Sequence, residues 1–285
     1  MKMSHVLPTL SIAAVLGASS TSFAAPVTIF EDNFDSHGDG VEVTSVAAPI
    51  GFNNYDLVTG ISANNVIQSA VNNGGNALAT TRTDGGAPSW VNGFWDIGTG
   101  IITGGHTYTI TYDIFRANSE SNTGFGIDAG YGFGSVNPIL LHGTGGVNSQ
   151  LLYRDSASNS YQDTGFTTGY GGWETYEIVL TLPANGGNPI SGTYDVFLTR
   201  NDPANSAGLL PRTLIVDDAT AYHTGLTDAV ALGRITYYSG PPEPLSGNDS
   251  TVYFDNISVV RNEVPEPASL ALLGLGGLVG LTRRR

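Results

Sequence analysis

The stretch His106-Thr107-Tyr108-Thr109-Ile110-Thr111-Tyr112-Asp113-Ile114-Phe115-Arg116 alternates between large apolar and small polar side chains. Its large apolar residues recur at every second position: Tyr108, Ile110, Tyr112 and Ile114. Successive side chains of a β-strand point to opposite faces, so a period of two indicates a strand with one buried face. This stretch therefore predicts a strand that covers a hydrophobic core.

The same alternation recurs along most of residues 25–262, and no segment there shows a helical period. It is clear in Trp173–Leu182 and Thr193–Arg200. Further strands are expected at 26–31, 41–46, 76–81, 90–97, 123–131, 148–154, 212–217, 229–238 and 250–260. Clusters of glycine and asparagine, which favour tight turns, separate them. About a dozen short strands predict an all-β fold: one antiparallel two-sheet jelly-roll sandwich over residues 25–262.

Residues 1–24 have the order of parts of a secretory signal peptide. A basic start with Lys2 precedes an apolar run from Val6 to Ala18, which is shorter than the roughly 20 residues that span a bilayer. Small residues before Ala25 suit signal peptidase, so we expect cleavage between Ala24 and Ala25. The alternative is a buried N-terminal helix that stays on the mature protein.

Residues 263–285 contain three parts in a fixed order. The motif Pro265-Glu266-Pro267 comes first, an apolar run of 14 residues follows at 268–281, and Arg283-Arg284-Arg285 ends the chain. As a helix this run would extend about 21 Å, which is short for a bilayer core of roughly 30 Å. It suits a transient anchor whose arginines remain on the cytoplasmic side.

This tail resembles the PEP-CTERM sorting signal in all its parts and in their order. The resemblance implies anchoring in the inner membrane through 268–281 and processing by an exosortase near Pro265-Glu266-Pro267. It also implies a Gram-negative bacterium that makes exopolysaccharide and biofilm, with the protein at the cell surface or outside the cell. The alternative is an ordinary C-terminal membrane anchor that is not processed.

The body is strongly acidic and contains no cysteine. Residues 25–262 carry seven arginines, no lysine and 23 acidic residues, a net charge of −16. Such a surface repels phosphate backbones, so nucleic acid is excluded as a partner. The absence of cysteine rules out disulfides, thiolate metal sites and cysteine nucleophiles. The carboxylates make a divalent cation such as structural calcium a reasonable ligand.

Both ends of the body read as strands with acidic residues. Glu31-Asp32-Asn33-Phe34-Asp35 opens it and Val252–Val259 closes it, which resembles concanavalin-like and carbohydrate-binding jelly rolls. Gly172–Leu180 with Gly192–Leu198 resembles a laminin-G-like hairpin. First and last strands of a sandwich often pair, which would bring Asp32 or Asp35 toward Asp255. Calcium would relieve the repulsion of these carboxylates. The apolar parity changes within Val252–Val260, which predicts a bulge near Asp255-Asn256.

Aromatic side chains are the remaining ligand candidates, since a sugar ring can stack on their faces. Most aromatic residues of a sandwich belong to its core, and we expect this of Trp95 and Trp173. Tyr170 and Tyr222 lie in expected loops and are the candidates for ligand binding.

Signatures of catalysis are missing. The sequence contains no His-Glu-x-x-His, Gly-x-Ser-x-Gly or phosphate-binding Gly-x-x-x-x-Gly-Lys motif. Glu174 and Glu177 are three residues apart, which places them on opposite faces of one strand and prevents a glycosidase pair. We therefore expect a non-enzymatic structural or adhesive protein of the extracellular matrix. The alternatives are a lectin-like carbohydrate-binding module and, less favoured, a polysaccharide-active hydrolase.

Overall fold

The structure is a computed structural model in which Ala25–Val264 form one compact body. It describes residues 25–42, 52–56, 63–71, 74–82, 91–96, 102–119, 122–128, 139–144, 149–155, 160–183, 192–221, 234–240 and 250–262. The expected signal helix and tail helix fall outside these ranges. Within them, no helix has the length and apolar character needed to cross a bilayer.

Every regular element in the described residues is a β-strand. In chain order they are β1 (Val27–Asp32), β2 (Val41–Glu42), β3 (Phe52–Asp56), β4 (Ala63–Ser69), β5 (Asn76–Arg82), β6 (Val91–Asp96), β7 (Thr107–Arg116), β8 (Asn122–Asp128), β9 (Ile139–Gly143), β10 (Gln150–Asp155), β11 (Ser160–Thr167), β12 (Trp173–Thr181), β13 (Thr193–Arg200), β14 (Leu210–Thr220), β15 (Arg234–Gly240) and β16 (Ser250–Asn262). The prediction of an all-β fold is confirmed.

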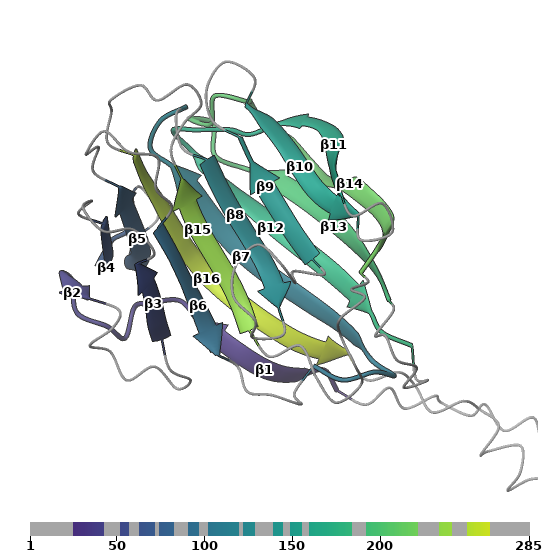
Figure 1. Ribbon diagram of the computed structural model, residues 1–285. Helices are drawn as coiled ribbons and strands as arrows, with labels where there is room; N and C mark the ends of the chain where they lie inside the picture. The colour runs from purple at the N-terminus through teal and green to yellow at the C-terminus, as the bar shows by residue number, and fades with distance from the viewer. Residues whose placement is uncertain are drawn as a thin grey trace, which may run out of the picture. The chain divides into compact units, whose positions relative to one another are not determined.

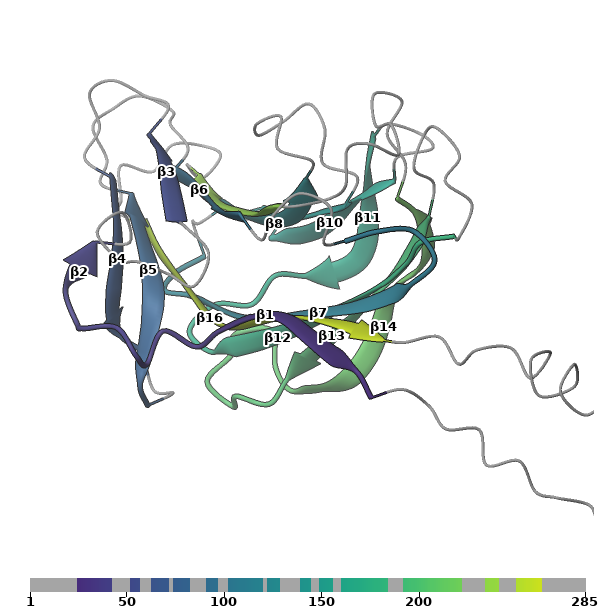
Figure 2. The ribbon, with the colours of Figure 1, turned by 90° about the horizontal axis from the view of Figure 1, so that it is seen from below.

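These strands form two antiparallel sheets that pack face to face (Figures 1 and 2). Sheet A has the order β14-β13-β12-β7-β16-β5-β4-β2, with β1 also paired to β16. Sheet B has the order β11-β10-β9-β8-β15-β6-β3. The order of each sheet interleaves strands that are distant in the sequence, as expected for a jelly-roll sandwich.

The alternating residues of β7 and β12 build the core between the sheets. Tyr112 and Tyr176 face inward from sheet A, and the Tyr112 ring stacks on Phe125 of sheet B with centroids 3.7 Å apart. Tyr237 of sheet B meets Phe254 of sheet A at 5.3 Å. Aromatic contacts therefore join the two layers, as the sequence period predicts.

Four strands were not expected from the sequence: β3, β4, β9 and β11. Two of them, β3 and β4, are rich in asparagine, which is rare in strands. β11 forms an edge of sheet B, and none of its residues is fully buried. A strand without a buried face needs no apolar alternation, so its sequence carries no period to detect.

The first and last strands of the body lie side by side, as predicted. β1 pairs with the second half of β16, from Val27 opposite Arg261 to Asp32 opposite Ile257, while β5 pairs with the first half. The register of β16 against β7 shifts between Asp255 and Ser258, and Asn256 has a φ of +49°. The predicted bulge is therefore present, and it switches the buried parity of the strand.

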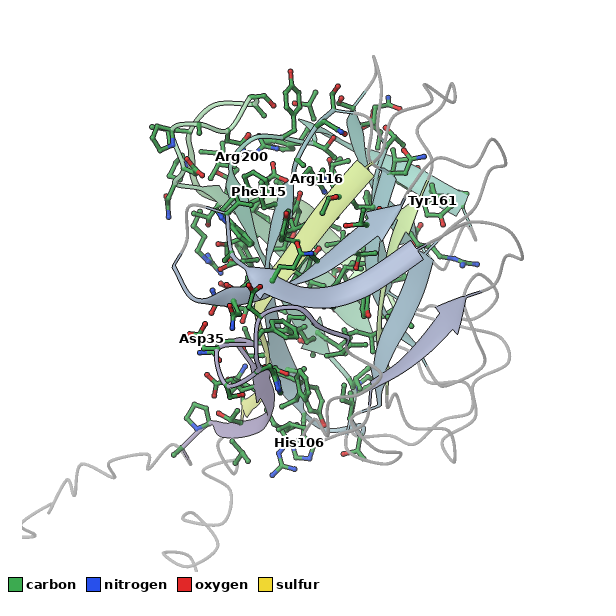
Figure 3. The ribbon with its side chains drawn as sticks, turned by 90° about the vertical axis from the view of Figure 1, so that its left-hand side faces the viewer. Asp35, His106, Phe115, Arg116, Tyr161 and Arg200 are labelled. Atoms are coloured by element: carbon green, nitrogen blue, oxygen red, sulfur yellow. The ribbon has the colours of Figure 1, made fainter. Side chains whose placement is uncertain are left out.

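The antiparallel registers give sheet A two opposite ends. The start of β1 and the end of β16 lie at one end, together with Thr107 and Thr181. The loops after β7, before β12 and after β13 lie at the other end. Eight residues of β12 separate the two ends, about 27 Å at 3.3–3.4 Å per residue. Figure 3 shows His106 at the first end and Arg116 with Arg200 at the second.

Candidate functional site

A buried carboxylate joins β7, β12 and β13 at the end of sheet A that is remote from the chain ends. Glu174 is 1% exposed, and it accepts hydrogen bonds from Arg116 Nη1 at 2.5 Å and Arg200 Nε at 2.6 Å. The Tyr176 hydroxyl donates to it at 3.0 Å and the Gly169 N–H at 2.9 Å. Four donors therefore converge on one carboxylate.

The electrostatics of this cluster hold each group in one protonation state. Burial by itself raises the pKa of Glu174, but the charges and hydrogen bonds of Arg116 and Arg200 outweigh it, so the pKa lies below its ordinary value. Burial, with the Glu174 charge adding to it, raises the pKa of the Tyr176 hydroxyl. Glu174 therefore remains a carboxylate and Tyr176 remains a neutral donor.

The two arginines of the cluster also hydrogen-bond the backbone at the start of the loop before β12. Arg116 Nη1 also donates to the Gly169 carbonyl at 3.4 Å, and Arg200 Nη2 donates to the Thr167 carbonyl. On the other side, Arg116 Nε and Nη2 donate to Thr123 Oγ1 of sheet B at 3.1 and 2.9 Å. One arginine therefore ties the loop to both sheets.

A second loop, 201–209, is locked onto the first, 168–172. The Tyr170 N–H donates to Ser206 Oγ and the Ser206 N–H donates to the Tyr170 carbonyl, both at 2.9 Å. Asn205 is 4% exposed and lies so close that a Cβ on Gly169 would stand 2.0 Å from its Oδ1. A Cβ on Gly172 would stand 2.5 Å from the Asn205 backbone nitrogen. Gly172 therefore meets backbone and requires glycine, whereas a Cβ on Gly169 would force the Asn205 side chain to move. We call these two loops the locked loop pair.

Each loop of the pair carries one large exposed side chain. Tyr170 is 40% exposed and Leu209 is 64% exposed. Tyr170, a ligand-binding candidate from the sequence, thus lies exposed in its loop. Trp173 is 9% exposed and packs with Phe115 and Ala77, as expected for a buried aromatic. Tyr222 lies outside the described residues, and so does the side chain of Trp95.

The three carboxylates expected to bind calcium do not gather. Asp32 accepts the Phe34 N–H at 2.7 Å, Asp35 accepts the Asn76 N–H at 2.8 Å, and Asp255 accepts the N–H of the neighbouring bulge residue at 2.7 Å. No three acidic or histidine side chains in the described ranges lie close enough to hold a metal ion. Each of these carboxylates therefore has a backbone partner of its own, and calcium binding by them stays a prediction.

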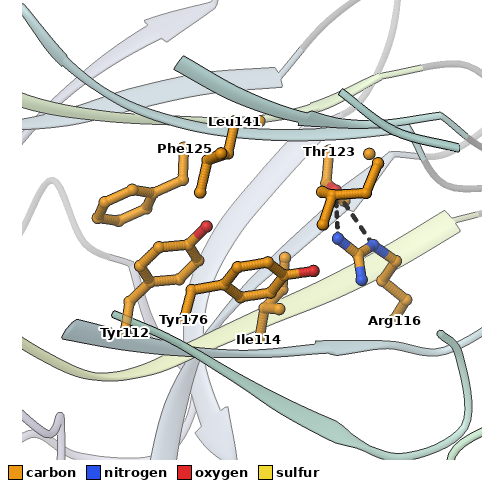
Figure 4. A pocket seen from close by; sticks show the side chains of 10 residues that line it. Tyr112, Ile114, Arg116, Thr123, Phe125, Leu141 and Tyr176 are labelled. Atoms are coloured by element: carbon orange, nitrogen blue, oxygen red, sulfur yellow. Dashed lines mark hydrogen bonds between the residues drawn. The ribbon is translucent and has the colours of Figure 1, made fainter. Parts of the chain in front are cut away.

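A small cavity lies beside the cluster, between the sheets. Tyr112, Phe125, Tyr176, Arg116 and Thr123 line it (Figure 4). Its volume of about 10 Å³ has room for one water molecule at most. The space between the sheets at this point is therefore packed core, with no room for a sugar.

The register of β8 with its two neighbours brings other residues of sheet B side by side. Gly124 of β8 stands opposite Tyr238 of β15 on one side and opposite His142 of β9 on the other. Gly126, two residues on, stands opposite Thr236, which is 5% exposed and whose Oγ1 finds no hydrogen-bond partner in the described structure. Sequence reasoning missed this juxtaposition, because β9 was not expected and β15 is distant from β8 in the chain.

The two glutamates of β12 lie on opposite faces, as predicted. Glu174 faces the core, while Glu177 pairs on the outside with Arg212 at 2.7 Å. Sequence reasoning missed the partners of Glu174, although one signal was present. Glu174 has the same parity as the core-facing Tyr176 and Ile178, and a carboxylate at a core-facing position requires cationic partners.

Among solved structures, the fold is similar to those of polysaccharide lyases and lectins. The endo-β-1,4-glucuronan lyase of the fungus Trichoderma reesei is 12% identical over 79% of this chain and 94% of that one, with a TM-score of 0.42. A marine alginate lyase of Aplysia kurodai is 13% identical over 68% and 86%, with a TM-score of 0.46. Lectin II of Ulex europaeus is 9% identical over 83% and 99%, with a TM-score of 0.45.

At the level of sequence, no curated protein matches the chain. Residues 263–285 do match the PEP-CTERM protein-sorting motif, which confirms the interpretation of Pro265-Glu266-Pro267, the apolar run and the terminal arginines. The motif implies transient anchoring at the membrane and processing by an exosortase. The chain is therefore an exported protein with a two-sheet β-sandwich body and a C-terminal PEP-CTERM sorting motif.

Proposed function

We propose that this protein is a non-enzymatic structural or adhesive component of an extracellular biofilm matrix. The single observation that carries the proposal is the sorting motif at residues 263–285. In this proposal, signal peptidase cuts between Ala24 and Ala25 in a Gram-negative bacterium, and an exosortase then acts near Pro265-Glu266-Pro267.

The pairing of β1 with β16 supports this route. Val27, two residues after the expected first cut, lies opposite Arg261, and the sorting motif begins directly after Asn262. Both processed segments therefore join the body at one end of sheet A. The rest of the sandwich, including the locked loop pair, is left free for contacts in the matrix.

The intact mass of the protein recovered from the native cell surface tests this route. We expect a chain that begins at Ala25 and lacks the apolar run 268–281. A Glu266→Ala variant should keep its tail, whereas the neighbouring Glu263→Ala, outside the Pro-Glu-Pro motif, should be processed normally. Surface protein that still contains residues 268–281 would contradict processing.

Carbohydrate binding is the second candidate function, and the exposed ring of Tyr170 favours it. A tyrosine ring offers an apolar face to the C–H side of a sugar while its hydroxyl stays in water. Binding needs no chemistry, so it is compatible with a non-enzymatic role.

An assay for polysaccharide cleavage separates these candidates from an enzyme. We expect no new reducing ends when the mature protein is incubated with exopolysaccharide from the producing cells. If reducing ends appeared, the non-enzymatic proposal would fall.

A further inference from the structure

The locked loop pair is more rigid than a surface connection needs to be. The buried amide of Asn205 packs against two glycines, the Ser206 N–H donates to the Tyr170 carbonyl, and the Tyr170 N–H donates to the Ser206 hydroxyl. Asp202 adds two further bonds, accepting the Trp173 N–H at 3.1 Å and the Ala204 N–H at 2.9 Å. The exposed Tyr170 therefore stands on a backbone with little freedom.

The stability of the fold alone does not explain why a cluster of three charged side chains is buried next to these loops. Replacing a buried ion cluster by apolar residues of similar volume is often neutral or stabilising, because desolvation offsets the attraction between the charges. Arg116, Glu174 and Arg200 instead position the loop backbone, because they hydrogen-bond it at Thr167 and Gly169. A rigid, pre-positioned side chain loses little entropy when it binds a ligand.

We propose that the locked loop pair is a saccharide-binding platform, in which the ring of Tyr170 stacks on a sugar ring of a neutral exopolysaccharide and Leu209 adds apolar contact from the second loop. This inference rests on the proposed location of the protein in the matrix, where such polymers are present. A neutral polymer fits better than a uronate-rich one, because the body has a net charge of −16 over residues 25–262.

The platform lies at the end of sheet A opposite the chain ends. Tyr170 precedes β12, whereas the tail leaves the body after Asn262, which stands opposite Thr107 at the other end. The strand length between these ends is about 27 Å. A protein attached through its tail therefore has its point of attachment and its sugar platform at separate ends, so attachment does not occupy the platform.

Affinity electrophoresis of the mature protein tests the platform. The probe is exopolysaccharide purified from the producing cells and separated by anion exchange into neutral and acidic fractions. We expect the neutral fraction, cast into the gel, to retard the wild type, and Tyr170→Ala to weaken this binding about tenfold or more, as truncation of a central aromatic contact does. Tyr170→Phe, which keeps the ring, should retain binding to within about threefold of the wild type, which is about half of the 1.4 kcal/mol that a tenfold change represents.

Tyr161 provides a matched control, since it is a tyrosine that is 49% exposed on the edge strand β11. Tyr161→Ala should bind as the wild type does, and all variants should unfold at the wild-type temperature. Equal binding by Tyr170→Ala and Tyr161→Ala, or no retardation of the wild type by the neutral fraction, would overturn the proposal. Retardation by the acidic fraction alone would also overturn it. If these failures occur while the surface protein shows the expected processed mass, only the platform is refuted and the exported role stands.

Discussion

Replacing Glu174 by glutamine is the perturbation that most directly tests the account of the buried cluster. The substitution keeps the volume of the side chain and removes its charge. In the wild type, both carboxylate oxygens accept hydrogen bonds, one from Arg116 and Tyr176 and the other from Arg200 and Gly169. The amide nitrogen of glutamine would have to face one of these pairs of donors.

The magnitude follows from the two arginines that would remain. Arg116 and Arg200 are each 4% exposed, so neither can recover its hydration when the carboxylate is lost. Removing one partner of a buried ion pair costs about 3–5 kcal/mol, a large part of the roughly 5–15 kcal/mol that stabilises a domain. At about 2–4 °C per kcal/mol for a domain of this size, the unfolding midpoint should fall by roughly 6–20 °C.

The assay is thermal and urea unfolding of the mature body, followed by circular dichroism. Glu177→Gln is the matched control, because Glu177 lies on the same strand and pairs with Arg212 at the surface. Exposed pairs contribute little, so we expect no measurable change in the midpoint. The triple variant R116M/E174L/R200M, which removes all three charges together, should recover part of the stability that Glu174→Gln loses.

An equal, small effect of Glu174→Gln and Glu177→Gln would refute the reasoning. It would mean that the Glu174 carboxylate is not the buried partner of both arginines. A triple variant less stable than Glu174→Gln would show instead that the backbone hydrogen bonds to the loop, rather than unpaired charge, dominate the energetics.

Three further predictions concern the loops, the bulge and the response to alkali. Gly172→Ala should destabilise the body by about 1–3 kcal/mol in urea unfolding, because its Cβ would stand 2.5 Å from the Asn205 backbone nitrogen; an unchanged midpoint would contradict the close approach. Asn256→Gly should be more stable than Asn256→Val by about 1–2 kcal/mol, since φ is +49° there; equal midpoints would argue against the bulge. Burial, with smaller effects of nearby acidic groups, raises the pKa of Tyr194. The folded state therefore favours the neutral phenol, so stability is fully present below the unfolded pKa of about 10 and falls as pH rises above it. Tyr194→Phe should flatten that decline in a series of melts, and an unchanged pH dependence would contradict it.

Much of the fold follows from the sequence because its signals are local. The alternation in β7, β12 and β13 is a property of neighbouring residues, and so is the change of parity within β16 that marks the bulge. The order of motif, apolar run and arginines at 263–285 is equally local, and reading it requires no folded structure.

What only the tertiary structure decided is which distant residues meet. Glu174 binds arginines that are 58 and 26 residues away in the chain, and Asn205 closes onto Gly172 from 33 residues away. The expected calcium ligands show both cases: Asp32 and Asp255 accept hydrogen bonds from residues one or two positions away in the sequence, whereas Asp35 accepts the N–H of the distant Asn76. A strand's period specifies which face is buried, but the register between strands specifies contacts, and register is settled by the packing of the whole sandwich.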